Sequence, residues 1–199
     1  MMTSSILRAP FAAPPAQPLC RIPADLSASW RLANGTPVLL RPVLPKDGTG
    51  LAGFVGGLSR ASRQARFPGS GESLSAAQLA ELTELDFDHH VGFVITVPDE
   101  GSDRIIGEAR FMVDGNTGSA DITLVVSDAW QRHGIGIQTL LAMARAAARR
   151  GLRWLRADVA CSNRATLNLL HRCGFTRTPH PDEDDLVRLH LLLLPPFPG

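Results

Sequence analysis

The sequence contains no tyrosine, only three cysteines, and nearly equal numbers of acidic and basic residues. Cys20, Cys161 and Cys173 are widely spaced and form no CxxC pair, so we expect neither a disulfide framework nor a metal site. Lys plus Arg number 20 and Asp plus Glu number 19, which gives a net charge of +1. This balance argues against binding through bulk positive charge, and we expect no nucleic-acid partner.

Long apolar runs are also missing. No run approaches the roughly 20 residues that a membrane-spanning helix needs, so we expect no membrane partner. The longest candidate, Leu189–Leu194, contains His190 and ends at Pro195, which indicates a strand. Together with the sparse cysteines, these absences favour a cytoplasmic protein.

The chain has 199 residues, of which 44% are apolar, and this is enough to bury one core. Residues 1–28 are rich in Ala, Pro and Ser, and five prolines prevent a continuous helix there. We expect residues 1–28 to be a disordered arm and residues 29–199 to be the folded domain.

Hydrophobic periodicity and turn residues predict an alternation of strands and helices. Strands are predicted over residues 37–42, 90–97, 104–113, 119–126, 153–160 and 187–194. Helices are predicted over residues 44–58, 76–85, 134–150 and 163–172, and in residues 59–67 a helical turn would place Arg60, Arg63 and Arg66 on one face. Short turns after residues 97 and 113 require antiparallel neighbours. The order predicts a mixed α/β sheet of the α+β type, antiparallel in its first half, with a crossover helix in its second.

Two glycines, Gly134 and Gly136, lie where a predicted strand leads into the long helix. They allow close backbone approach, and the unpaired N–H groups and dipole of a helix start favour an anion. We expect a phosphate or pyrophosphate to bind the segment Gln131, Arg132, His133, Gly134, Ile135, Gly136 and Ile137. One alternative is that the glycines only shape a tight turn. A dinucleotide site is a second alternative, although Thr139 stands at its third glycine and the preceding strands are antiparallel.

Two motifs resemble the hallmarks of the GNAT N-acetyltransferases. Residues 131–136 fit the Q/R-x-x-G-x-G/A signature, which binds the pyrophosphate of acetyl-CoA in that family. Asn163 followed by Gly174-Phe175 resembles the N-x(10)-G-F helix end. The resemblance covers about residues 37–194. It implies the GNAT fold, a mixed and mostly antiparallel central sheet flanked by helices, with acetyl-CoA as cosubstrate.

Within this family, Arg41-Pro42 and the L-S-x-x-S-R-x-x-R-F run of residues 58–67 resemble the Pat-type protein lysine acetyltransferases. This likeness implies acetyl transfer to an amine acceptor, a protein lysine, by direct attack in a ternary complex. A small-molecule amine acceptor is one alternative. A non-catalytic acyl-CoA-binding sensor module is another. The oligomeric state is expected to be a monomer or a homodimer.

A lysine amine with a pKa of about 10.4 must lose a proton before it attacks a thioester. The likeness to Pat-type enzymes, which carry a Glu at the same place, implies Asp121 as the base, acting directly or through a water. Alternation with its neighbours also allows Asp121 to be a solvent-facing strand residue. Glu108 on the preceding strand is the second candidate.

The resemblance also implies residues that contact the cofactor. A backbone N–H of Val125 or Val126 is expected to bind the thioester oxygen, and a β-bulge there would splay the central strands. Asn163 either bonds the CoA amides or caps its own helix. Leu170 stands where many members have the tyrosine that protonates the leaving thiolate, and we expect it to pack on the CoA side. A tyrosine acid is excluded.

Overall fold

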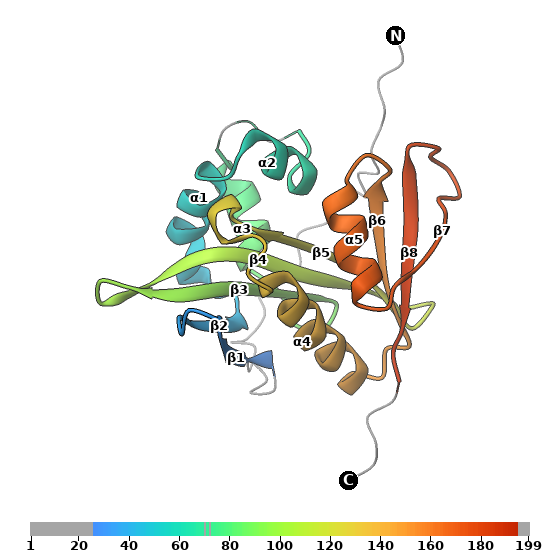
Figure 1. Ribbon diagram of the computed structural model, residues 1–199, viewed down its shortest axis with the longest axis horizontal. Helices are drawn as coiled ribbons and strands as arrows, with labels where there is room; N and C mark the ends of the chain where they lie inside the picture. Colours follow the sequence, from blue (N-terminus) through green and yellow to red (C-terminus); the bar gives the residue numbers. More distant parts are fainter. Residues whose placement is uncertain (1–25, 70, 72, 195–199) are drawn as a thin grey trace.

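The computed structural model describes residues 26–69, 71 and 73–194, which form one eight-stranded sheet flanked by five α-helices (Figure 1). The strands are β1 (Ala28–Arg31), β2 (Pro37–Pro42), β3 (His90–Asp99), β4 (Ser102–Asp114), β5 (Ser119–Val126), β6 (Trp154–Ala160), β7 (Thr176–Pro179) and β8 (Leu186–Leu192). The helices are α1 (Gly48–Gly56), α2 (Arg60–Arg66), α3 (Ala76–Thr83), α4 (Ile135–Arg149) and α5 (Arg164–Arg172).

The strand order across the sheet is β1-β2-β3-β4-β5-β6-β8-β7. All neighbours are antiparallel except β5 and β6, which are parallel and are joined through α4. A parallel pair needs such a crossover because a tight hairpin turn can only reverse the chain. The antiparallel first half and the crossover helix predicted from the sequence are therefore confirmed.

The two central strands diverge after a short stretch of pairing. β5 pairs with β6 only through residues 119–121, whereas it pairs with β4 along residues 119–126. Figure 1 shows β5 and β6 running apart from this point. The expected bulge at Val125 or Val126 is not the cause, because the β4–β5 register is continuous there and the sheet irregularity lies between β3 and β4 at Ile95 and Thr96.

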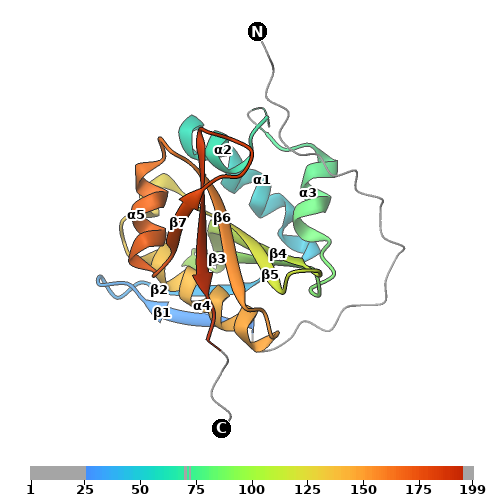
Figure 2. The same cartoon turned by 90° about the vertical axis from the view of Figure 1, so that its right-hand side faces the viewer.

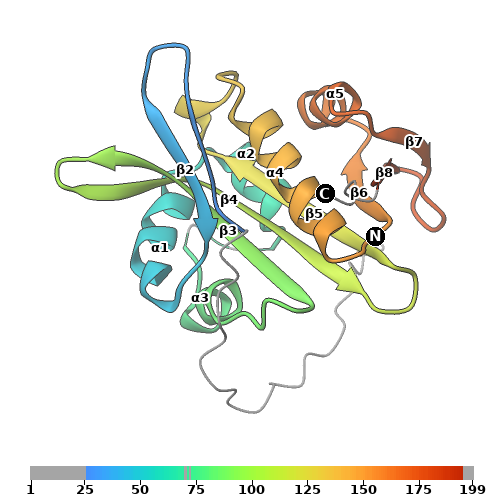
Figure 3. The ribbon, with the colours of Figure 1, turned by 90° about the horizontal axis from the view of Figure 1, so that it is seen from below.

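Each face of the sheet carries a core. Helices α1, α2 and α3 cover one face over a cluster that includes Leu51, Val55 and Val125. Helix α4 covers the other face, where Met143 and Leu155 are fully buried, and α5 contributes Leu170 to the same cluster. Figure 2 shows α1, α2 and α3 on the opposite side of β3, β4 and β5 from α4. In Figure 3 the same layers are seen from below, with α5 beside β6 and β8.

The folded domain begins earlier than the expected boundary at residue 29. Leu26 is only 2% exposed and β1 starts at Ala28, so the last residues of the predicted arm belong to the sheet and its core. The expectation for residues 1–25 lies outside the described residues. Two strands were also not predicted, β1 and β7. β7, Thr-Arg-Thr-Pro, has no apolar alternation to mark it, whereas in β1 Ala28 and Trp30 do alternate with Ser29 and Arg31, a signal of only four residues beside the proline-rich arm.

Gly107 lies where β4 packs most tightly against its neighbours. A Cβ placed there would be 2.6 Å from Ile95 Cδ1 and 3.0 Å from the carbonyl oxygen of Val125. The second contact is with backbone, which cannot move aside as a flexible side chain can. No atom lies within 4 Å of a Cβ placed on Gly115, in the turn between β4 and β5.

We therefore expect Gly107→Ala to lower the free energy of unfolding by about 1–3 kcal/mol, because overpacking forces backbone to shift. Gly115→Ala is the matched control and should change it by less than about 0.5 kcal/mol. Urea denaturation followed by circular dichroism measures both. Equal effects of the two substitutions would contradict the tight approach of β4 to β3 and β5.

Candidate functional site

The loop between β5 and α4 enters the helix through residues with left-handed backbone. Gly134 has φ +82° and is the N-cap of α4, and Arg132 has φ +64°. A left-handed φ favours glycine, so Gly134 does shape the turn, as the first alternative for the motif supposed. Gly136 serves a different purpose, because a Cβ there would lie 3.1 Å from Leu169 of α5. The absence of a side chain at Gly136 allows α4 and α5 to approach closely.

The same loop presents backbone donors to solvent. The first four N–H groups of an α-helix have no partner inside the helix, and here they belong to the segment around Gly134–Ile137. Gly134 is exposed and has open space on its Cβ side. Arg132 and His133 are also exposed beside it. Unpaired donors, a helix dipole and an adjacent guanidinium together can bind an anionic group.

The register of β5 decides which of its N–H groups face the gap left by β6. The Ser127 N–H donates to Ile106 O on β4 at 2.8 Å. Because successive residues of a strand direct their backbone groups to opposite edges, Val125 also faces β4, whereas Leu124 and Val126 face the gap. Of the two candidates from the sequence, the geometry therefore favours Val126 over Val125. It also adds Leu124, which the two-residue alternation could have indicated once one hydrogen bond of the strand was known.

A carboxylate connects this loop to α2. Asp128 accepts hydrogen bonds from the Ser59 N–H at 2.9 Å, from Ser59 Oγ at 2.7 Å and from Ser62 Oγ at 2.8 Å. Gln131 donates through Nε2 to Val126 O at 3.0 Å. Partial burial raises the pKa of Asp128, but the hydrogen bonds from Ser59 and Ser62 outweigh it and leave the pKa below its usual value. The serines of the L-S-x-x-S motif thus anchor the glycine loop.

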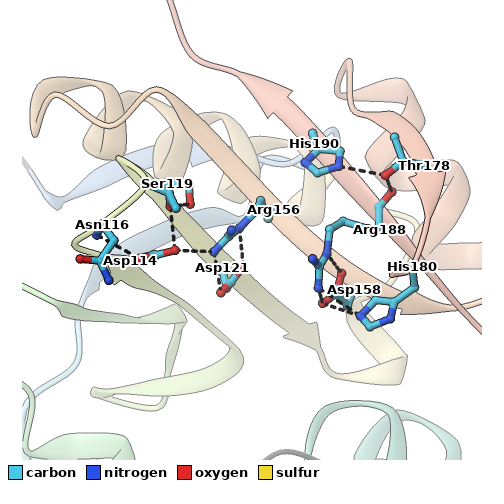
Figure 4. A network of polar contacts seen from close by, with 11 residues as sticks. Asp114, Asn116, Ser119, Asp121, Arg156, Asp158, Thr178, His180, Arg188 and His190 are labelled. Carbon is cyan, nitrogen blue, oxygen red and sulfur yellow. Dashed lines mark hydrogen bonds and ion pairs between the residues drawn. The ribbon is translucent and has the colours of Figure 1, made fainter. Parts of the chain in front are cut away.

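Asp121 lies at the last paired position of β5 and β6, opposite Arg156. The Arg156 Nε donates to its Oδ1 at 3.0 Å, and Nη2 donates to Oδ2 and to Asp114 Oδ2, each at 3.3 Å (Figure 4). The side chain of Asp121 is 49% exposed. The carboxylate is therefore oriented by a guanidinium at the point where the strands begin to diverge, and it is open to solvent.

Glu108, the second candidate base, is in a different environment. It is 2% exposed and binds Arg66 through two hydrogen bonds of 2.9 and 3.0 Å, and Arg110 through one of 2.8 Å. Burial raises the pKa of Glu108, but the two guanidinium groups outweigh it and hold the pKa below the usual range. A buried carboxylate held by two cations is a poor proton acceptor, so the geometry argues against Glu108 as the base.

Two residues expected to contact the cofactor, Asn163 and Leu170, make contacts within the protein instead. Asn163 is the N-cap of α5, and its Oδ1 accepts from the Thr166 N–H at 3.1 Å, so the capping alternative describes its side chain. Leu170 is 3% exposed and lies in the core shared by α4, α5 and the sheet. The expectation that Leu170 packs toward CoA is not supported, because its side chain is enclosed by other core residues.

The structure reveals a second polar network on the same sheet face as Asp121, which we did not predict. Arg188 binds Asp158 through hydrogen bonds of 2.7 and 2.8 Å, and His180 Nε2 lies 3.3 Å from Asp158 (Figure 4). Arg156 and Asp158 alternate with the buried Leu155, Ala157 and Val159 along β6. This alternation was the available signal for a polar, partly exposed face.

Neither a metal centre nor a membrane segment is found in the part of the chain that the structure describes. His89 and His90 follow Asp86, but Asp86 Oδ1 accepts three backbone N–H groups in this turn, from residues 88, 89 and 90. No group of three or more His, Cys, Asp or Glu side chains within the described ranges could hold a metal ion. Among the described helices none is long and apolar enough to cross a bilayer.

Comparison with known proteins agrees with this architecture. The family described as "Acetyltransferase (GNAT) domain" matches residues 38–176. An acetyltransferase of Pseudomonas aeruginosa is 29% identical over 163 residues, which cover 82% of this chain and 87% of that relative. The GNAT domain of S. lividans PAT has a TM-score of 0.77 and 26% identity, covering 87% of this chain and 100% of that one.

A more distant structure shows likeness of fold alone. Spermidine N-acetyltransferase from Vibrio cholerae, solved with CoA and spermine, has a TM-score of 0.65 and 17% identity, covering 78% of this chain and 95% of that one. The GNAT fold implied by the sequence motifs is therefore confirmed.

The hydrogen bonds of Asp128 predict how the glycine loop responds when its anchor is removed. Asp128→Ala deletes three hydrogen bonds and should lower the free energy of unfolding by about 1–2 kcal/mol. Asp128→Asn retains one acceptor oxygen, so its stability should lie between that of the wild type and that of Asp128→Ala. Asp103→Ala, at an exposed position of β4, is the control. Thermal denaturation checks the order, and an Asp128→Ala protein as stable as the control would contradict the anchor.

The lowered pKa values predict an acid-sensitive fold. Folded Glu108 and Asp128 have pKa values below those of the unfolded chain, where Asp and Glu titrate near 3.9 and 4.3. The unfolded state therefore binds more protons as the pH falls, so stability is present above about pH 5 and is lost below about pH 4. Glu108→Gln should reduce this pH-dependent loss in urea denaturation between pH 6 and pH 3. An unchanged pH dependence would contradict the role of Glu108.

Proposed function

The chain belongs to the GNAT acetyltransferase domain family, and on this basis we propose that it transfers the acetyl group of acetyl-CoA to an amine, with a protein lysine as acceptor. One observation carries the proposal. Where β5 leaves β6, its open edge leads directly into the glycine loop at the start of α4. Donors for the thioester end and for the pyrophosphate of acetyl-CoA therefore lie one after the other along the chain.

The residues present fit acetyl-CoA. The N–H groups around Gly134–Ile137 and the Arg132 side chain suit the pyrophosphate, because they supply unpaired donors and positive charge. The backbone N–H groups of Leu124 and Val126 suit the pantetheine and thioester end. When bound, acetyl-CoA supplies a thioester carbonyl that an amine can attack. Asn163 supports this site indirectly by capping α5, which packs against Gly136 through Leu169.

Distance along β5 selects the donor for the carbonyl oxygen. Asp121 is three residues from Leu124 and five from Val126, or roughly 10 and 16 Å at about 3.3 Å per residue. One ordered water and an amine can bridge the shorter span but not the longer. We therefore assign the Leu124 N–H to the carbonyl oxygen, where it would stabilise developing negative charge, and the Val126 N–H to the pantetheine.

Asp121 is the proposed base of the reaction. Its carboxylate lies at the edge of the gap, is open to solvent and is oriented by Arg156. It accepts the amine proton through a water, while binding of both reactants supplies much of the rate through positioning. No tyrosine is available to protonate the leaving thiolate. With an ordinary thiol pKa of about 8.5, the thiolate can take its proton from water.

A protein lysine suits the surface around Asp121. Arg156, Asp158 and Arg188 lie on one face of β6 and β8 (Figure 4), and their side chains are 22–34% exposed, so a folded acceptor can approach this face. The L-S-x-x-S-R-x-x-R-F run, which resembles Pat-type enzymes, forms α2 on the same side. The structural likeness to the GNAT domain of S. lividans PAT supports this choice over a small-molecule amine.

Substitution of Asp121 tests the proposal. Asp121→Asn should lower kcat at least 100-fold and leave CoA affinity by calorimetry unchanged, because proton removal contributes about 10²–10⁴-fold to rate. Asp121→Glu should retain most activity. Asp114→Asn is the matched control, since it removes the other carboxylate on Arg156. Turnover is followed by the release of free thiol from acetyl-CoA with lysine peptides.

The outcomes separate this enzyme from a non-catalytic sensor. Binding of CoA without turnover toward any amine, in the wild type as in Asp121→Asn, would sink the catalytic proposal. An equal loss of kcat in Asp121→Asn and Asp114→Asn would instead mean that both carboxylates act only by positioning Arg156.

A further inference from the structure

A pocket of about 240 Å³ lies between the end of α2, helix α3 and strand β4. Arg66, Gln78, Glu81 and Arg110 supply its polar walls, and Phe67, Pro68, Leu74 and Leu82 supply its apolar walls. We name it the Arg110 pocket. Sites for drug-sized molecules measure about 300–1,000 Å³, so this volume suits one side chain or small group of a larger ligand.

Glu81 at the rim of the Arg110 pocket is exposed, and among the buried charged side chains of this cluster the charges do not cancel. Glu108 is shared between Arg66 and Arg110, which leaves one positive charge in excess among the three. The side chains of the two arginines are only 12% and 15% exposed, and that of Glu108 is 2% exposed. Such an arrangement is a costly way to stabilise a fold, because apolar side chains of similar volume often do as well or better.

One donor of the cluster has no hydrogen-bond partner in the described part of the chain. Arg110 donates through Nε to Glu108, whereas its Nη2 is buried with no hydrogen-bond partner among the described residues. A buried, unsatisfied donor on a charged group costs more than a neutral one, so a bound acceptor atom would relieve a real penalty. Gln78 adds a second donor, since its Oε1 accepts from the Ser75 N–H and its NH₂ group is left to donate.

The pocket is close to the proposed reaction centre. Arg110 is the cross-strand partner of Thr123, which lies midway between Asp121 and Val125 on β5 and faces the same side of the sheet. Thr123 Oγ1 is also buried without a hydrogen-bond partner in the described part of the chain. From the level of Arg110, Asp121 is two residues along β5, roughly 7 Å. A single acceptor peptide can therefore reach both Arg110 and Asp121.

We propose that the Arg110 pocket binds a carboxylate carried by the acceptor, so that the enzyme prefers a lysine with a glutamate or aspartate close to it. This rests on the proposed acetyl transfer to a protein lysine. Arg110 Nη2, Arg66 and the Gln78 amide are the donors, and Phe67 and Leu82 cover the methylenes of the acidic side chain. Glu81 also lines the pocket, but it is exposed and its charge is screened by water.

Peptide acceptors test the inference. Lysine peptides that carry one glutamate at each of the three positions before or after the lysine are compared with twins that carry glutamine there. We expect at least one glutamate peptide to exceed its twin about 10- to 100-fold in kcat/KM, mainly through KM, as a charge-assisted hydrogen bond would give. Arg110→Gln should bring this ratio near 1, while Arg60→Gln, at the exposed start of α2, should leave it unchanged.

A second variant guards against misfolding of Arg110→Gln. Gln78→Glu keeps the capping box with Ser75, because glutamate is a standard partner in that motif, and it places a negative charge in the pocket. The glutamate preference should disappear in this variant too. Ratios near 1 for every wild-type pair, or a ratio that survives both Arg110→Gln and Gln78→Glu, would overturn the inference.

Calorimetry separates this inference from the proposed function. Binding of each peptide pair is measured with CoA present, which carries no acetyl group and permits no turnover. A glutamate preference in binding without acetylation of any amine would support the pocket and contradict the proposed activity. Acetylation of both twins at equal rates and with equal affinities would support the activity and contradict the pocket.

Discussion

The constraint on which the site depends is the loss of pairing between β5 and β6 after Asp121. A parallel pair normally satisfies the backbone groups on both inner edges, but here β5 continues for five residues without this neighbour. Those residues are kept in strand conformation by β4 alone, and β4 is positioned to do so by Gly107, whose missing side chain lets the two backbones approach. The result is a strand with one edge that pairs with no other described strand over residues 122–126.

An edge whose N–H groups face the gap and whose other side is paired with β4 is suited to a ligand, because its donors are already aligned. The same edge leads into the glycine loop, where Gln131 donates back to the Val126 carbonyl. Asp128 then joins this loop to Ser59 and Ser62 at the start of α2. The glycine loop and α2 are therefore held to each other by short hydrogen bonds, so displacement of one would move the other.

Asp121 and Glu108 lie on the same face of the sheet but in different environments. Asp121 is half exposed and bound to one arginine, which leaves it accessible to a proton donor. Glu108 is enclosed and bound to two arginines, which makes it a permanent counter-charge. The two side chains lie on the same face of neighbouring strands, yet burial and the number of cations give them different chemistry. The excess of arginine around Glu108 is what makes the Arg110 pocket a candidate for anion recognition.

Local features of the fold followed from the sequence. Turn residues and hydrophobic alternation predicted the antiparallel strands 90–126, and apolar periodicity predicted α4 and α5 to within about two residues. Strand β7 was not predicted because it has no apolar residue pattern, and β1 was not predicted because its alternation spans only four residues next to the proline-rich arm. The glycine motif could be recognised as a helix start because Gly134 answers a local demand of the backbone, its left-handed φ.

Placement across strands was beyond the reach of sequence. The chain order cannot say that Arg66, Glu108 and Arg110 share one buried cluster, that Leu170 is enclosed in the core, or that Leu124 and Val126 rather than Val125 face the gap. Amino-acid sequence determined most of the elements, their order and the glycine turn that begins α4, since these depend on neighbouring residues. Only the tertiary structure decided which carboxylate is open and which N–H groups are free, because burial and strand register arise from contacts between segments far apart in the chain.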